Sequence, residues 1–108
     1  MYKGRPRIKR GILQRFEDLP FCKQTNFRKV ANKVRELDDT VKEVFIYGSY
    51  FWGNWDEESD YDVRINQSFK GSYADLKDNL LKEDGLKVDL MALKKPKIEM
   101  NLVVIPVG

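Results

Sequence analysis

The chain has 108 residues, of which 42% are hydrophobic and 34% are charged, a balance that predicts one soluble globular domain and excludes a disordered chain. There is no histidine, which excludes histidine-activated serine or cysteine nucleophiles and zinc sites with histidine ligands. No apolar run approaches the ~20 residues that cross a bilayer, and Cys22 is the only cysteine, so we expect a cytoplasmic protein with neither a membrane span nor a disulfide.

The net charge of +3 is unevenly distributed, because five basic residues lie within the first ten: Lys3, Arg5, Arg7, Lys9 and Arg10. They form either a solvated terminus or an arm that contacts nucleic acid or an acidic partner surface. Apolar residues then recur at helical spacing from Ile8 to Leu19, and Pro20 is expected to end this first helix. We therefore expect a basic arm with a helix at residues 1–20 and the main body of a single domain at residues 21–108.

A second helix is predicted to begin after Thr25 or Asn26, either of which could cap its N-terminus. Its apolar stripe consists of Phe27, Val30, Val34 and Leu37, and the pair Asp38–Asp39 marks its end. Residues 42–48, KEVFIYG, are rich in β-branched and aromatic side chains and stop at a glycine. This composition predicts a short strand that is buried on both faces.

Residues 49–55 are expected to form a short helix, with Ser49 near its N-terminus. The next segment, residues 60–66, reads DYDVRIN and alternates cleanly between polar and apolar side chains. Such alternation predicts a strand with one polar and one apolar face. The polar face carries Asp60, Asp62 and Arg64, and the apolar face carries Tyr61, Val63 and Ile65.

A third helix is predicted to begin at a capping box formed by Ser72 and Asp75 and to stop at Gly85. Its apolar face consists of Tyr73, Leu76, Leu80 and Leu81. Residues 86–93 then alternate between polar and apolar side chains, which predicts a strand with one charge inside it, Asp89. The apolar tail at residues 98–108 is either an edge strand with Pro106 or a helix. Strands interleaved with helices predict an α/β fold (α+β) with helices packed on a small mixed sheet.

Three carboxylates on predicted strands need an explanation: Asp60, Asp62 and Asp89. Same-face neighbours on a strand lie roughly 6.5–7 Å apart, so Asp60 and Asp62 can direct their carboxylates to one point. Their negative charges would repel each other unless a cation lies between them. If Asp89 lies on a neighbouring strand, three carboxylates can hold two magnesium ions about 3.5–4 Å apart, as in phosphoryl or nucleotidyl displacement.

The Gly48–Ser49 turn that follows the first predicted strand supplies the other half of such a site. Gly48 permits close approach of the backbone to a ligand. The Ser49 hydroxyl, with the backbone N–H groups at the start of the next helix, can hold phosphate oxygens. We therefore expect phosphates held at Ser49 to lie near metal ions held by Asp60 and Asp62.

The spacing of these motifs resembles the signature of the DNA polymerase β-like nucleotidyltransferase superfamily: Gly-Ser, ten residues, then Asp-x-Asp. Here this is Gly48–Ser49, residues 50–59, then Asp60-Tyr61-Asp62, and KVDLMAL around Asp89 is similar to the later strand with the third carboxylate. The resemblance covers residues 42–93. In length the chain most resembles the minimal nucleotidyltransferases, the MNT domains often paired with a HEPN partner protein.

One position departs from the superfamily pattern. The loop often reads Gly-Ser-(Arg or Tyr)-Ala-Arg-Gly, and here Gly53 is kept while Trp52 stands where the arginine is usual. Arg64, on the same strand face as the Asp pair, is the candidate to supply the positive charge at the triphosphate. Trp52 itself either stacks on a base or belongs to the core, where aromatic side chains are common.

The resemblance implies a metal-dependent nucleotidyltransferase that uses two Mg²⁺ ions and ATP or another nucleoside triphosphate. Gly48 and Ser49 would hold the β- and γ-phosphates, and Asp89 would accept the proton of the attacking hydroxyl. With so short a chain we expect the acceptor to arrive on a separate macromolecule, and the resemblance implies a HEPN-type toxin that receives AMP. Two other classes stay open: a non-catalytic protein that covers a partner, and a nucleic-acid-binding module that uses the basic arm.

Overall fold

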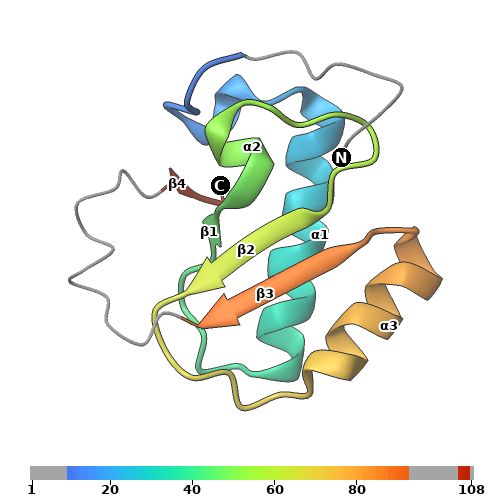
Figure 1. Ribbon diagram of the computed structural model, residues 1–108. Coiled ribbons are helices and arrows are strands. Elements are labelled where there is room, and N and C mark those ends of the chain that lie inside the picture. Colours follow the sequence, from blue (N-terminus) through green and yellow to red (C-terminus); the bar gives the residue numbers. More distant parts are fainter. Residues whose placement is uncertain (1–9, 93–104, 108) are drawn as a thin grey trace, which may run out of the picture.

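The computed structural model describes residues 10–92 and 105–107. In chain order its elements are η1 (Phe16–Asp18), α1 (Phe21–Leu37), β1 (Phe45–Ile46), α2 (Gly48–Trp52), β2 (Tyr61–Ile65), α3 (Tyr73–Asp84), β3 (Val88–Ala92) and β4 (Ile105–Pro106). The strands form one sheet in the order β3-β2-β1-β4 (Figure 1). β2 and β3 are parallel and are joined through α3, whereas β1 is antiparallel to both β2 and β4. The predicted α/β fold with a small mixed sheet is therefore confirmed.

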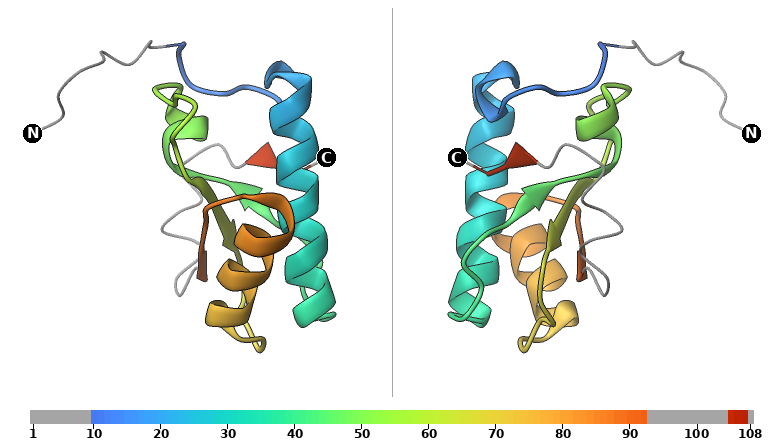
Figure 2. Two further views of the ribbon diagram at one scale, coloured as in Figure 1. Left: turned by 90° about the vertical axis from the view of Figure 1, so that its right-hand side faces the viewer. Right: turned by 90° about the vertical axis from the view of Figure 1, so that its left-hand side faces the viewer.

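The two long helices, α1 and α3, lie on the same side of the sheet (Figure 2). The predicted stripe on α1 is confirmed, because Phe27, Val30 and Val34 are buried at helical spacing. β2 contributes Tyr61, Val63 and Ile65 to this core, and the Phe27 ring meets the Tyr61 ring edge to face. The alternate residues of β2 and β3 therefore project from the opposite face of the sheet. Within the described residues, no helix has both the length and the apolar character needed to cross a membrane.

The helix predicted from Ile8 to Leu19 is wrong for its described part, where only the 3₁₀ turn η1 is helical. The reason lies in the backbone hydrogen bonds of this segment. The N–H groups of Arg10 and Leu13 donate to the carbonyls of Gly53 and Phe51, at 2.8 Å each, so the segment runs alongside α2. Its apolar residues still reach the core, where Leu13, Phe16 and Leu19 are buried. The basic residues at positions 3–9 lie outside the described residues.

α1 begins at Phe21, earlier than the predicted start after Thr25 or Asn26. Pro20 is the N-cap, and its carbonyl accepts hydrogen bonds from the N–H groups of Lys23 and Gln24. Pro20 therefore precedes a helix rather than ending one, in keeping with the frequency of proline at helix starts. The predicted end is confirmed, since the helix stops at Leu37 and Asp38 is the C-cap.

The remaining elements follow the predictions more closely. α2 starts at Gly48, one residue early, and α3 has the predicted N-cap, with the Ser72 hydroxyl accepting from the Asp75 N–H. β1 is much shorter than residues 42–48, and it is not buried on both faces, because Ile46 is buried while Phe45 is only half-buried. β4 is an edge strand, which confirms for Ile105–Pro106 the prediction of an edge strand in the tail. Apart from Val107, the rest of the tail lies outside the described residues.

Candidate active site

Two of the three predicted carboxylates lie directly beside each other. Asp62 on β2 and Asp89 on β3 are register partners in the parallel pair. Neighbouring strands are about 4.8 Å apart, so both side chains leave the same face of the sheet at nearly the same point. That face is opposite to the one covered by α1 and α3, because Tyr61 and Val63 on either side of Asp62 are buried in the core. The condition set by the sequence, that Asp89 lie on the strand next to the one with Asp62, is thus met.

The Gly48–Ser49 turn is in contact with Asp62. Gly48 has φ +66°, and a β-carbon at this position would overlap the Asp62 carboxylate. The backbones are also joined, because the N–H of Tyr47 donates to the carbonyl of Asp62 at 2.9 Å. Antiparallel pairing of β1 with β2 holds the end of β1 against Asp62, so the turn and the acidic strand lie side by side.

The carboxylates also interact electrostatically. Burial, together with the negative charges of Asp89 and Asp60, raises the pKa of Asp62 from 3.8 to about 6, and Arg64 partly opposes this shift. A carboxyl group whose pKa rises beside like charges is stabilised in its charged form by a cation. Asp60 directly precedes β2 instead of lying within the strand and is exposed, and its charge still acts on Asp62.

Arg64 lies one pleat along β2 from Asp62, on the same face. Its guanidinium carbon is 3.5 Å from the centroid of the Tyr47 ring, a cation–π stack across the β1–β2 pair. The sequence assigned positive charge to Arg64 but gave no indication that Tyr47 would hold the guanidinium. The stack orients this cation on the face that carries Asp62 and Asp89.

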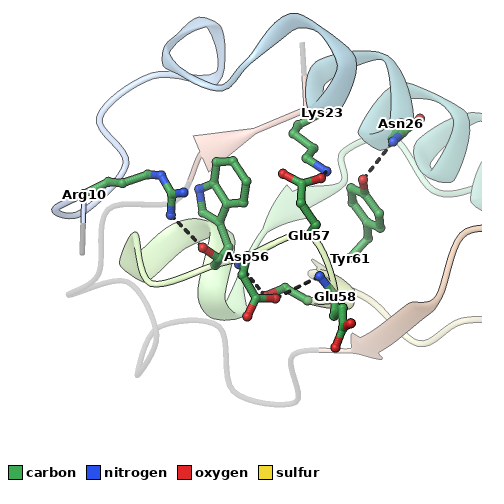
Figure 3. A network of polar contacts seen from close by, with 9 residues as sticks. Arg10, Lys23, Asn26, Asp56, Glu57, Glu58 and Tyr61 are labelled. Carbon is green, nitrogen blue, oxygen red and sulfur yellow. Dashed lines mark hydrogen bonds and ion pairs between the residues drawn. The ribbon is translucent and has the colours of Figure 1, made fainter. Parts of the chain in front are cut away.

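The acidic residues at positions 56–62 fall into two groups, and the first, Asp56 and Glu57, makes polar contacts of its own (Figure 3). Asp56 shapes the loop, because its carboxylate accepts a hydrogen bond from the Glu58 N–H at 2.8 Å while its own N–H donates to the Ser59 hydroxyl. Glu57 forms an ion pair with Lys23 of α1 at 2.8 Å. Asp56 and Glu57 therefore have structural contacts, whereas Asp60 and Asp62 stay the predicted site carboxylates of this run.

α1 also anchors the start of β2. Lys23 is only 6% exposed although Glu57, its partner, is mostly exposed. Burial acts to lower the pKa of Lys23, but the hydrogen bond and charge of Glu57, with Tyr61, outweigh it and raise the pKa. The Asn26 side chain donates to the Tyr61 hydroxyl at 2.7 Å, also visible in Figure 3. These contacts fix Tyr61, which lies between Asp60 and Asp62.

Trp52 does not belong to the core, since it is 39% exposed while Tyr50 and Phe51 beside it are buried. Its ring meets Phe51 edge to face, and with Gly11, Ile12 and Asn54 it lines a cavity of about 430 Å³. Of the two roles considered for Trp52, burial in the core is therefore wrong. Stacking on a base stays a prediction.

The donors suit a hard divalent cation, because all three are carboxylates and the charges of Asp60 and Asp89 raise the pKa of Asp62. They are not gathered around one point, however. Within residues 10–92 and 105–107, no group of three His, Cys, Asp or Glu side chains is placed to hold a metal ion. Asp89 instead has its Oδ1 atom 3.6 Å from the Nζ atom of Lys77 on α3. The assignment of Asp60, Asp62 and Asp89 as ligands of two Mg²⁺ ions stays a prediction.

Comparison with known proteins gives one match. The model of the family described as "Nucleotidyltransferase domain" matches residues 27–105, a range that runs from α1 to β4 and includes Gly48, Ser49 and all three carboxylates. Neither the curated proteins nor the solved structures include a match to the chain.

Proposed function

The chain belongs to the nucleotidyltransferase domain family, and from that premise we propose that it transfers AMP from ATP to a hydroxyl group of a partner macromolecule. The family accounts for nucleotidyl transfer in general. The choice of ATP, of magnesium and of a macromolecular acceptor is our proposal.

The observation that carries the proposal is the placement of Asp62. It is paired in register with Asp89, and its carboxylate lies against the backbone of Gly48. A triphosphate held at Gly48–Ser49 would therefore lie beside the two carboxylates. Without a cation, its negative charge would be repelled by them.

Each residue then has a defined role in the proposed reaction. Asp60, Asp62 and Asp89 would hold two Mg²⁺ ions, which would supply positive charge to the phosphates of the nucleotide. Gly48 and Ser49 hold the β- and γ-phosphates, and Arg64, kept in place by Tyr47, supplies a further positive charge.

The chemical step is an in-line displacement. The acceptor oxygen attacks the α-phosphorus of ATP, the bond from that phosphorus to the bridging oxygen of the β-phosphate breaks, and pyrophosphate leaves with the electron pair. Asp89 accepts the proton of the acceptor hydroxyl as a general base. The product is an AMP phosphodiester on the acceptor.

We further propose that the acceptor is a HEPN-type protein and that this chain acts as its antitoxin by adenylylating one of its Tyr, Ser or Thr hydroxyls. The proposal rests on the resemblance to minimal nucleotidyltransferases carried by Gly48–Ser49, Asp60-Tyr61-Asp62 and Asp89. Nucleotidyl transfer does not depend on this last assignment, which can fail separately.

The experiment is to incubate the purified chain with α-labelled ATP, Mg²⁺ and the product of the neighbouring gene, and to measure an added AMP mass on that product. Asp62→Asn should abolish labelling, and Asp56→Asn, in the loop before β2, is the matched control that should retain it. Inhibition of the partner at a 1:1 ratio without labelling would support the non-catalytic class instead. Salt-sensitive binding of RNA without AMP transfer would support the nucleic-acid-binding class.

A further inference from the structure

Lys77 contacts Asp89 from outside the sheet. β3 is at one edge of the sheet, and α3, which precedes it in the chain, packs against it. Leu76 and Leu80 of α3 are fully buried and fix the helix on the core. Lys77 follows Leu76 directly and extends past the edge strand, so that its Nζ atom lies 3.6 Å from Oδ1 of Asp89.

The Asp89 carboxylate therefore has neighbours of opposite sign. Asp62 is its register partner on β2, and its negative charge repels that of Asp89. Lys77 lies on α3 and attracts it. A carboxylate placed between a like charge and an ammonium group is drawn toward the ammonium group. This arrangement gives a physical reason why the described residues contain no group of three carboxylates placed to hold a metal ion.

We propose that Lys77 is a positioning residue that competes with the divalent cation for Asp89 and thereby sets the metal affinity of the site. The inference rests on the proposed function, because it requires Asp89 to act as a metal ligand. The ammonium group of Lys77 supplies the Asp89 carboxylate with positive charge that a bound divalent cation would otherwise supply. Metal binding requires the Asp89 carboxylate to leave Lys77 and turn toward Asp62.

We expect the protein to keep its fold when the ion pair between Lys77 and Asp89 is removed. The Lys77 and Asp89 side chains are 53% and 50% exposed, and an ion pair at such exposure contributes little to stability. The effect of Lys77 on the cation is electrostatic, so it should shrink as the salt concentration rises. Lys82 lies in the same helix, is exposed and carries the same charge, which makes it a matched control.

The test measures Mn²⁺ binding to the metal-free protein by the electron paramagnetic resonance signal of free Mn²⁺, without nucleotide and at low salt. Lys77→Met should tighten Mn²⁺ binding about two- to five-fold, the factor that corresponds to an exposed ion pair. Lys77→Arg, which keeps the positive charge, should bind Mn²⁺ with nearly the affinity of the wild type. Lys82→Met should leave the Mn²⁺ affinity unchanged. Lys77→Gln, a polar substitution, should behave like Lys77→Met.

The outcomes separate this inference from the proposed function. If the wild type binds Mn²⁺ in an Asp62-dependent way but Lys77→Met and Lys82→Met have the same affinity, the role of Lys77 is refuted while the proposed metal site stands. Weaker Mn²⁺ binding by Lys77→Met than by the wild type would also refute the role of Lys77. If the wild type shows no Asp62-dependent Mn²⁺ binding, both the metal site and the role of Lys77 are refuted.

Discussion

The Asp62 carboxylate lies in the space that a side chain at residue 48 would occupy, so Gly48 and Asp62 are packed against each other across the β1–β2 pair. This contact joins the turn after β1 to the acidic strand β2. It requires a residue without a side chain at position 48, and the positive φ of Gly48 requires the same.

Gly48→Ala should therefore destabilise the protein more than the same substitution at a glycine with open space around it. Gly85 has nearly the same φ, +68°, and a β-carbon there would meet open space, so Gly85→Ala measures the backbone strain alone, about 1–2 kcal/mol. Overlap with Asp62 should add about 1–3 kcal/mol to the loss for Gly48→Ala. Urea unfolding of both variants checks this difference, and equal losses would contradict the contact.

The raised pKa of Asp62 predicts a pH dependence of stability in metal-free protein. The folded pKa, about 6, exceeds the ordinary value of 3.8, so the folded state binds more protons than the unfolded state between these values. Stability attributable to Asp62 should thus be lost as the pH rises from about 4 to about 6. Because this carboxyl group is only partly buried, we expect a loss of about 1 kcal/mol after solvent screening.

Asp62→Asn provides the comparison for that pH dependence. Relative to the wild type, the variant should gain about 1 kcal/mol between pH 4 and pH 7 in the presence of EDTA, since it lacks the group that titrates. Urea unfolding at several pH values measures both proteins. Parallel curves would mean that the Asp62 carboxyl group titrates normally in the folded state.

The two groups of acidic residues should respond differently to loss of charge. Asp60→Asn should weaken Mg²⁺-dependent ATP binding at least ten-fold with little change in stability, because Asp60 is exposed. Asp56→Asn should lower stability by up to about 1 kcal/mol, because a neutral amide oxygen is a weaker acceptor for the Glu58 N–H than the carboxylate, and should leave ATP binding nearly unchanged. Calorimetric titration with Mg²⁺ and ATP, together with thermal unfolding of both variants, tests whether Asp60 belongs to the site and Asp56 to the loop structure. Equal effects on ATP binding would show that the division of the acidic run is wrong.

Ser49→Ala should weaken ATP binding by about 1–3 kcal/mol, the range for a lost hydrogen bond to a charged group. The N-cap of α2 is Tyr47, and Ser49 is inside the helix, so no capping contribution is lost with the hydroxyl. Thermal stability should therefore change by less than about 0.5 kcal/mol. Calorimetry with Mg²⁺ and ATP, compared with a thermal melt, tests this. A large fall in melting temperature with unchanged binding would make Ser49 a structural residue only.

Local patterns in the sequence determined β2 with its two faces and the ends of α3. The alternation in residues 61–65 required one buried face, which placed Asp62 on the other face, and the cap at Ser72 and the stop at Gly85 fixed α3. The spacing of Gly48–Ser49 and Asp60-Tyr61-Asp62 was also sufficient to indicate the family. These features depend on neighbours in sequence, and so they can be read without the fold.

Only the tertiary structure decided which charges meet. Glu57 and Asp60 are close together in an acidic run, yet Glu57 pairs with the buried Lys23 while the charge of Asp60 acts on Asp62. Lys77 reaches Asp89 because α3 packs beside the edge strand β3. The N-terminal segment shows the same limit. Its apolar residues have helical spacing, but the described part of the segment forms no α-helix, because the N–H of Leu13 donates to a carbonyl of α2. Such contacts join residues that are distant in the chain. They contribute to stability only after the helices and strands have packed together, so local sequence patterns do not predict them.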